Sequence, residues 1–346
     1  MDQEYTEIKN KIEKTLDFWL PHEPDSLWAE RIFGDIGRGF SAEAYKFMIA
    51  PIRELICRGG KRWRPILMTL VCDTLGGGDA AIPLSPIVEL SHTASLIHDD
   101  IEDESDERRG QPAIHKIFGV DVAINAASFL YFLASACIET SGLKNKELMY
   151  ASWIESLRKL HLGQTIDIMW HRDITFVPKI DDYFLMSSLK TGSIARLSTM
   201  LGAYSAGAPP SATRILGSVA DKIGIGFQIL DDVKNLTTGV DGKQRGDDVV
   251  EGKKGYPVIL YLNRYQEKRE QIFYFFHEAK TNGICTPEVE ELIDTLSPTG
   301  VFEEAEEKGR ALLFEARDIV RSHNFTNLSM SEKGFKLLDN FFDTIM

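Results

Sequence analysis

Apolar side chains recur at helical spacing along most of the chain. The repeat is clear over residues 8–20, returns over residues 144–170, and dominates residues 311–342. Positions three and four apart share one face of an α-helix, so these segments predict amphipathic helices. Alternating, strand-like stretches are scarce, and the best of them, residues 174–178, is more typical of a loop. The pattern predicts an all-α protein.

Turn-forming clusters divide these helical segments without creating a linker. They include Gly59-Gly60, Gly207–Pro210 and the segment 237–254, which we expect to be a loop. None is a long Ser/Pro-rich stretch, so we expect a single domain over residues 1–346. Several helices are uncharged on most sides and should form a buried central bundle.

Composition narrows the classes of partner. The 346 residues contain 39 Lys and Arg against 52 Asp and Glu, a formal charge of −13. This balance argues against nucleic acid and against anionic membranes, although a local cationic pocket can still bind an anion. The longest uncharged stretch, residues 122–138, is shorter than the ~20 residues of a membrane span and predicts a core helix. The four cysteines lack zinc-ligand spacing, and no secretory signal opens the chain, so we expect a cytoplasmic protein with no transmembrane segment.

The first candidate for chemistry is an acidic cluster at the end of a predicted helix, residues 89–103. Asp99 and Asp103 are four residues apart and share a face, with Asp100 at its flank. An isolated cluster of this kind is more often a solvated helix end. Here, however, Arg108 and Arg109 follow, and arginine suits bidentate phosphate recognition. Carboxylates for Mg²⁺ followed by guanidiniums predict a diphosphate site.

A second helix repeats this order of acids and bases. Asp231 and Asp232 precede a loop with Lys243 and Lys253. If the two helices face each other, their carboxylates flank one cavity with a polar mouth and an apolar depth, which suits a diphosphate with a hydrocarbon tail. Residues 59–65 (GGKRWRP) add three cations before a helix, and they are equally consistent with an anion site and a solvated turn.

Together these motifs resemble the trans-isoprenyl diphosphate synthase, or polyprenyl synthetase, family. The resemblance covers about residues 55–260 and adds GQTIDI at 163–168 and KTG at 190–192. It implies an all-α, single-domain orthogonal helix bundle around a deep central cavity, of the isoprenoid synthase type, usually a homodimer. The implied reaction joins an allylic diphosphate head to tail with isopentenyl diphosphate.

The resemblance also implies a role for each matching position. Mg²⁺ is expected on the carboxylates of Asp99, Asp100, Asp103, Asp231 and Asp232. The allylic diphosphate is expected on Arg108, Lys190, Lys243 and Lys253, and isopentenyl diphosphate on Lys61, Arg64, His92 and Arg109. The catalytic group beside the reacting carbon is expected to be Lys190, Thr191 and Gln228. One departure is Asn235, where the family often has a third Asp of the second motif.

In this family the residues one turn before the first acidic motif form the floor of the tail cavity. Here they are Ala94 and Ser95, which are small, so the resemblance implies geranylgeranyl diphosphate or a longer product. The alternative is that Phe129, Tyr131, Phe132 or residues of the 144–170 helix close the cavity instead.

Two other functions share this architecture. A non-catalytic partner subunit of another prenyl synthase would be expected to lose one acidic cluster or the paired arginines, and this chain keeps them. A class I terpene cyclase usually has an NxxSxxxE-like second motif, but the expected Glu position after Asn235 holds Gly242.

Overall fold

The computed structural model describes residues 2–35, 41–239, 244–322 and 330–346, and these residues are almost entirely helical. Within these ranges the one sheet is an antiparallel pair of two-residue strands, β1 (Glu107–Arg108) and β2 (Gln111–Pro112). The first helices are α1 (Asp2–Trp19), α2 (Ser26–Phe33), α3 (Ala42–Cys57), α4 (Trp63–Thr74), α5 (Ser85–Glu102), α6 (Ile114–Phe118), α7 (Val120–Thr140), α8 (Lys146–Arg172), α9 (Ile180–Ser187) and α10 (Ser193–Ser205). The later ones are α11 (Pro210–Leu236), α12 (Asp247–Glu251), α13 (Tyr256–Arg264), α14 (Arg269–Asn282), α15 (Pro287–Leu296), α16 (Val301–Ser322) and α17 (Glu332–Ile345). Short 3₁₀ turns are η1 (Gly78–Leu84), η3 (Gln266–Lys268) and η4 (Ser297–Thr299), and η2 (Ser188–Gly192) is a π-helical turn. The all-α prediction is confirmed.

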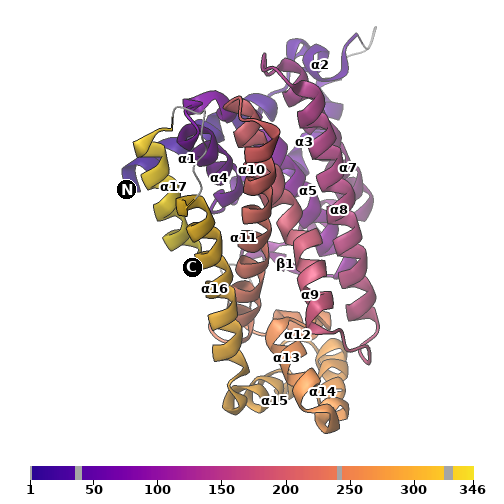
Figure 1. Ribbon diagram of the computed structural model, residues 1–346. Coiled ribbons are helices and arrows are strands. Elements are labelled where there is room, and N and C mark those ends of the chain that lie inside the picture. Colours follow the sequence, from indigo (N-terminus) through magenta and orange to yellow (C-terminus); the bar gives the residue numbers. More distant parts are fainter. Residues whose placement is uncertain (1, 36–40, 240–243, 323–329) are drawn as a thin grey trace.

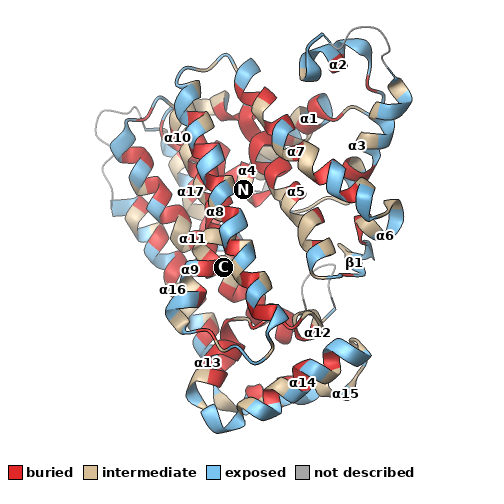
Figure 2. Ribbon diagram, turned by 90° about the vertical axis from the view of Figure 1, so that its right-hand side faces the viewer, coloured by how far each residue is buried: buried red, intermediate tan, exposed pale blue. Residues whose placement is uncertain are grey.

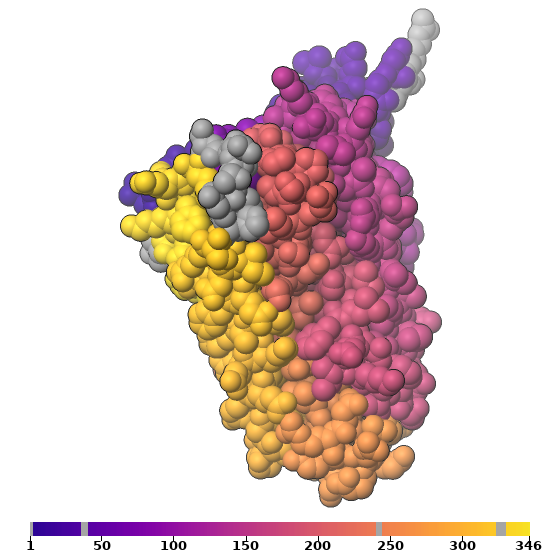
Figure 3. All heavy atoms as spheres, viewed as in Figure 1, coloured from indigo at the N-terminus to yellow at the C-terminus, as the bar shows by residue number. Residues whose placement is uncertain are grey.

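The long helices run side by side along the length of the molecule (Figure 1). The most extensive contacts join α11 to α16, α5 to α7, and α10 to α11 and α4. The short helices α12–α15 gather at one end, and α2 lies at the other. From the outside, α16 and α17 form a continuous flank beside α10 (Figure 3).

Two groups of buried apolar side chains hold the helices together. The larger joins the first helices to α10, α11 and α17, and the smaller joins α13–α16 to the ends of α8, α9 and α11. Figure 2 shows this burial concentrated on inward faces, while the outer faces of α14 and α15 are exposed. Area removed from water is the main stabilising term for such a bundle.

Helices α5 and α11 carry the acidic motifs near their C-terminal ends. Both begin with proline in the first turn, where its missing N–H and fixed φ are tolerated. The C-terminus of a helix bears partial negative charge, so carboxylates there are unfavourable unless cations lie nearby. The packing of cations against these two helix ends is therefore the central feature of the site.

The sequence makes specific predictions for three segments, residues 122–138, 174–178 and 237–254. The uncharged stretch forms α7, the one helix in the described ranges that is long and apolar enough to cross a membrane, and half of its most apolar window is buried in the protein. Residues 174–178 lie in the loop between α8 and α9, as expected. The segment 237–254 was expected to be only loop but contains α12. Lys243 lies outside the described residues.

Candidate active site

A cavity of about 860 Å³ lies between the C-terminal halves of α5, α8 and α11. Both acidic motifs reach it, because Asp99 and Asp231 are among its lining residues. The basic segment after α3 and the arginine pair of the β1–β2 turn line the same space. The expectation that two distant acidic patches share one hollow is met.

Asp99 is the centre of a polar cluster on the α5 side. Its Oδ1 accepts hydrogen bonds from Lys190 Nζ at 3.0 Å and from Gln164 Nε2 at 2.9 Å, and Arg108 lies 3.6 Å from its Oδ2. Lys190 also pairs with Asp167 at 2.5 Å. Burial alone would lower the pKa of Lys190, but Asp167 and Asp99 outweigh it and the pKa is raised. This lysine stays charged in the cavity.

Asp100 points away from the cavity. It is fully buried, and its Oδ1 accepts hydrogen bonds from Arg108 Nε at 2.8 Å and from Arg108 Nη2. A charge-assisted pair of this kind fixes both groups. Asp100 therefore holds the β1–β2 turn and orients Arg108.

Asp103 lies just beyond the last residue of α5, under the loop that follows α12. Its Oδ2 pairs with Lys253 Nζ, which also lies 2.8 Å from Glu251. Burial raises the pKa of Asp103 to about 7, against the opposing effect of Lys253. His171, at the end of α8, lies with Nδ1 3.7 Å from the other oxygen, Oδ1.

Both carboxylates of the second motif line the cavity, but their surroundings differ. Asp232 is only 5% exposed and accepts three hydrogen bonds: from Tyr183 Oη at 2.6 Å, Gln228 Nε2 at 2.9 Å and the Tyr256 amide at 2.8 Å. Burial raises the pKa of Asp232 to about 6. Because protein donors occupy both oxygens, Asp232 positions its neighbours.

The expected catalytic residues lie on the π-helical turn η2 and on α11. Thr191 Oγ1 donates to Gln228 Oε1 at 2.7 Å, and both residues line the cavity. The turn fits because Gly163 on α8 and Gly224 on α11 pack directly against its backbone, where a Cβ atom at either position would collide. A π-helical turn in this setting re-aims Lys190 and Thr191 toward the cavity.

All three cations of the basic segment 59–65 line the cavity, although Arg62 is only 4% exposed. Lys61 and Arg64 line the cavity, and Arg64 Nη1 lies 3.1 Å from His92 Nε2. Burial, with help from Arg64, lowers the pKa of His92, so it is neutral and can accept this hydrogen bond. Arg62 is instead held by Glu13 and Glu89, at 2.8 and 2.7 Å.

Arg109 completes this basic end of the cavity. It has a left-handed backbone with φ of 56°, and its Nη1 donates to the carbonyls of Leu55 and Gly59. Its guanidinium packs on Gly60, where a Cβ atom would lie only 3.1 Å from Nη2. The glycine is required because the arginine lies over its backbone.

Apolar and aromatic side chains also line the cavity, among them Leu160, Ile194 and Phe227. Ser95 and Leu96 of α5 contribute, and Tyr131 of α7 lines the cavity between His98 and His161, with ring centroids 5.8 and 5.3 Å away. Ala94 is fully buried and is not among the described residues that line the cavity. Neighbouring residues on a helix point about 100° apart, so only Ser95 of the expected pair faces the space.

The sequence arguments missed several residues that the structure brings to the site. Gln164 and Asp167, three apart on α8, contact Asp99 and Lys190. The GQTIDI motif contained both, so the signal was present. Tyr183 and Glu251 had no such signal, because their contacts with Asp232 and Lys253 depend on how distant helices pack.

Comparison with known proteins agrees with this geometry. The profile of the polyprenyl synthetase family matches residues 46–295. Geranylfarnesyl diphosphate synthase of Aeropyrum pernix is 32% identical over 277 residues, which cover 77% of this chain and 85% of that protein. Geranylgeranyl pyrophosphate synthase D of Phomopsis amygdali is 30% identical over 82% of this chain and 66% of its own length.

Solved structures show the same fold. Geranylgeranyl pyrophosphate synthetase from Pyrococcus horikoshii superimposes with a TM-score of 0.80 at 24% identity, covering 99% of this chain and 98% of that one. The extent of the family match and the two relatives at 32% and 30% identity decide the assignment: this chain belongs to the polyprenyl synthetase family.

Proposed function

We propose that this protein transfers the prenyl group of an allylic diphosphate to isopentenyl diphosphate, head to tail, and makes an all-trans polyprenyl diphosphate. The observation that carries the proposal is the single cavity lined by Asp99, Asp231 and two separate sets of cations. Two sets of cations suit two diphosphates, whereas a terpene cyclase binds one.

The acidic side of the cavity is the proposed site of the allylic diphosphate. Carboxylates from facing helices are a donor set that suits Mg²⁺, which prefers oxygen ligands and shares its shell with phosphates. Of the five predicted carboxylates, we infer that Asp99 and Asp231 hold the ions from the cavity wall. Asp100 is committed to Arg108, and Asp232 to Tyr183. Asp103, whose buried side chain pairs with Lys253, is a further proposed ligand once Lys253 turns to the diphosphate. Bound there, Mg²⁺ would neutralise the charge that develops on the leaving diphosphate.

The protein cations complete that neutralisation. Arg108, Lys190 and Lys253 are oriented by carboxylates at the cavity wall, and they are the proposed contacts of the allylic diphosphate. The loop residue Lys243 stays a prediction from the family resemblance. Thr191 and Gln228, joined by their hydrogen bond, lie where they can stabilise a developing allylic cation with oxygen atoms.

The basic end is the proposed site of isopentenyl diphosphate. Lys61, Arg64 and Arg109 present positive charge to the cavity, and neutral His92 accepts a hydrogen bond from Arg64. Arg64 also lies over the Trp63 ring, 4.3 Å from its centroid, which fixes the guanidinium. The apolar lining between the two ends excludes water from the cation.

We infer that the product is geranylgeranyl diphosphate or longer. Ser95 is small and opens the cavity toward α7 and α8, where Tyr131 and His161 provide bulk. The structure therefore favours the alternative floor, built from α7 and α8, over Ala94. Names of the relatives, geranylgeranyl and geranylfarnesyl synthases, are consistent with this range.

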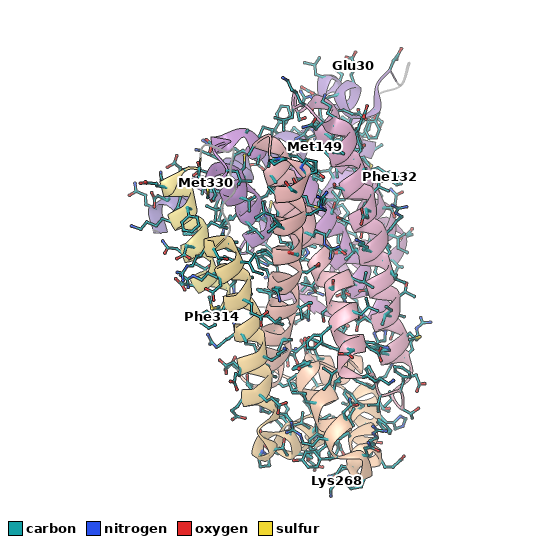
Figure 4. The ribbon with its side chains drawn as sticks, in the orientation of Figure 1. Glu30, Phe132, Met149, Lys268, Phe314 and Met330 are labelled. Carbon is teal, nitrogen blue, oxygen red and sulfur yellow. The ribbon has the colours of Figure 1, made fainter. Side chains whose placement is uncertain are left out.

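We further propose a cytoplasmic homodimer. Support for the dimer comes from apolar side chains exposed along α6 and α7, including Ile117, Ile124 and Phe132, the last 72% exposed and pointing away from the body in Figure 4. Support for the compartment comes from the four cysteines, which are all free thiols in the structure.

The test is incubation with radiolabelled isopentenyl diphosphate, Mg²⁺ and each allylic primer in turn, followed by chain-length analysis. We expect the radiolabel in products of twenty carbons or more. No incorporation with any primer would favour the partner-subunit alternative.

A further inference from the structure

One buried contact of Asp103 has no part in the roles assigned above. His171 Nδ1 and Asp103 Oδ1 are 3.7 Å apart, and neither atom has a hydrogen-bond partner among the described residues. His171 is 4% exposed, and the Asp103 side chain is fully buried. A buried polar atom without a partner destabilises the folded protein, so two that face each other call for an explanation.

The backbone around His171 is held from both sides. Lys254 Nζ donates to the carbonyl of Trp170 at 2.7 Å and to that of Asp173 at 3.1 Å, the residues that flank the end of α8. Gly252, with φ of 77°, packs so closely on the His171 carbonyl that a Cβ atom would lie 3.1 Å from it. The loop after α12 thus fixes His171 in front of Asp103.

The same loop carries Lys253, the cation that pairs with Asp103. Lys253 pairs with Asp103 Oδ2 and with Glu251, yet its proposed role is to contact the allylic diphosphate. When Lys253 turns to that diphosphate, Oδ2 becomes available to a metal ion. Asp103 then needs another donor to hold its orientation, and His171 lies within 4 Å of the remaining oxygen.

We propose that His171 is a positioning residue for Asp103, donating from Nδ1 to Oδ1 while Oδ2 faces the metal ion. This inference rests on the proposed function, since it assumes that Asp103 is a ligand. A second-layer donor of this kind orients a ligating carboxylate, and its loss typically weakens metal binding about 10–100-fold.

The test measures retention of radiolabelled inorganic pyrophosphate by the full chain at increasing Mg²⁺ concentration, in equilibrium dialysis. His171→Leu should raise the Mg²⁺ concentration for half-maximal retention about 10-fold. His171→Asn places an amide N–H near the position of Nδ1 and should restore binding to within about threefold of the unaltered protein. His277→Leu, at an exposed histidine of α14, is the matched control and should change nothing.

A double variant separates positioning from a merely structural role. In an Asp103→Asn background, His171→Leu should have no further effect on Mg²⁺ dependence, because the two groups act as one unit. If His171→Leu fails to fold, His171→Gln, whose amide lies at the ε position, takes its place. An unchanged Mg²⁺ dependence in the loss variant, or an equal shift with and without Asp103, would overturn the proposal. Absence of pyrophosphate retention by the unaltered protein would instead overturn the diphosphate site itself.

Discussion

Asp231 and Asp232 are neighbours in the chain but have different surroundings. Both line the cavity, but Asp232 is almost fully buried and accepts hydrogen bonds from Tyr183, Gln228 and the Tyr256 amide. In the first motif, Asp99 lines the cavity, whereas Asp100 is held by Arg108. Each acidic motif therefore contains one carboxylate proposed to bind metal and one that fixes its neighbours, and substitutions can separate these two roles.

Asp231→Asn should lower kcat at least about 100-fold and leave the melting temperature unchanged, because it removes charge stabilisation of the leaving group from a cavity-facing position. Steady-state kinetics and thermal unfolding check this. Asp232→Asn is the comparison, and it should lower the melting temperature because it disturbs a buried hydrogen-bond network. A lowered melting temperature for Asp231→Asn would contradict this difference between Asp231 and Asp232.

Tyr131→Ala should lengthen the product, because it removes bulk that lines the tail cavity. Ser95→Phe should shorten it by filling the same space from α5. Chain-length analysis of extracted products measures both. Phe314→Ala, at an exposed ring on α16 (Figure 4), is the control. If Tyr131→Ala leaves the product unchanged, the tail cavity ends elsewhere.

At the scale of elements, the C-terminal helix α17 forms part of the cavity wall although it is far from the acidic motifs in sequence. Ile345 lines the cavity, and α17 packs on α4, the helix that follows the basic segment. Arg317 of α16 grips Asp339 of α17 through both carboxylate oxygens, at 2.9 and 2.8 Å, and Arg321 does the same from one turn away. The two arginines hold the pKa of Asp339 well below its usual range.

This clamp should make the docking of α17 sensitive to acid. A carboxylate with a lowered folded-state pKa contributes stability above its ordinary pKa of about 4 and loses that contribution as pH falls further. Asp339→Asn should cost about 1 kcal/mol of unfolding free energy at pH 7, a modest value because the site is partly solvated. Urea unfolding at pH 7 and pH 3 measures the difference, which should narrow at pH 3. An equal difference at both pH values would exclude the ion pair as its cause.

Much of this architecture could be predicted from the chain. Helical periodicity indicated the long helices, and the spacing of Asp99 and Asp231 relative to the following cations indicated a shared diphosphate cavity. Helix α12 was missed because five residues are too few for a periodic signal. The sequence did not distinguish Ala94 from Ser95, because which of them faces the cavity depends on the rotation of α5 in the bundle. Tyr183 was missed because its contact joins two helices far apart in sequence.

At the scale of the whole molecule, the exposed apolar side chains of α6 and α7 suggest how copies associate. Phe132→Glu should shift the protein from dimer to monomer, because a two-fold interface would bury the new carboxylate once from each copy. Sedimentation velocity measures the shift. Phe314→Glu, an exposed ring on α16, should leave the dimer intact. A protein that sediments as a monomer before any substitution would contradict the proposed assembly.

The whole-molecule account depends on α5 and α11 gripping one diphosphate from opposite sides. The direct measurement is a crystal structure with Mn²⁺ and a non-reactive thiolo analogue of an allylic diphosphate, with the ions located by anomalous scattering. The account predicts Mn²⁺ beside Asp99 and beside Asp231, both bound to the same diphosphate. Ions beside only one of these carboxylates, or a diphosphate bound outside the cavity, would contradict it.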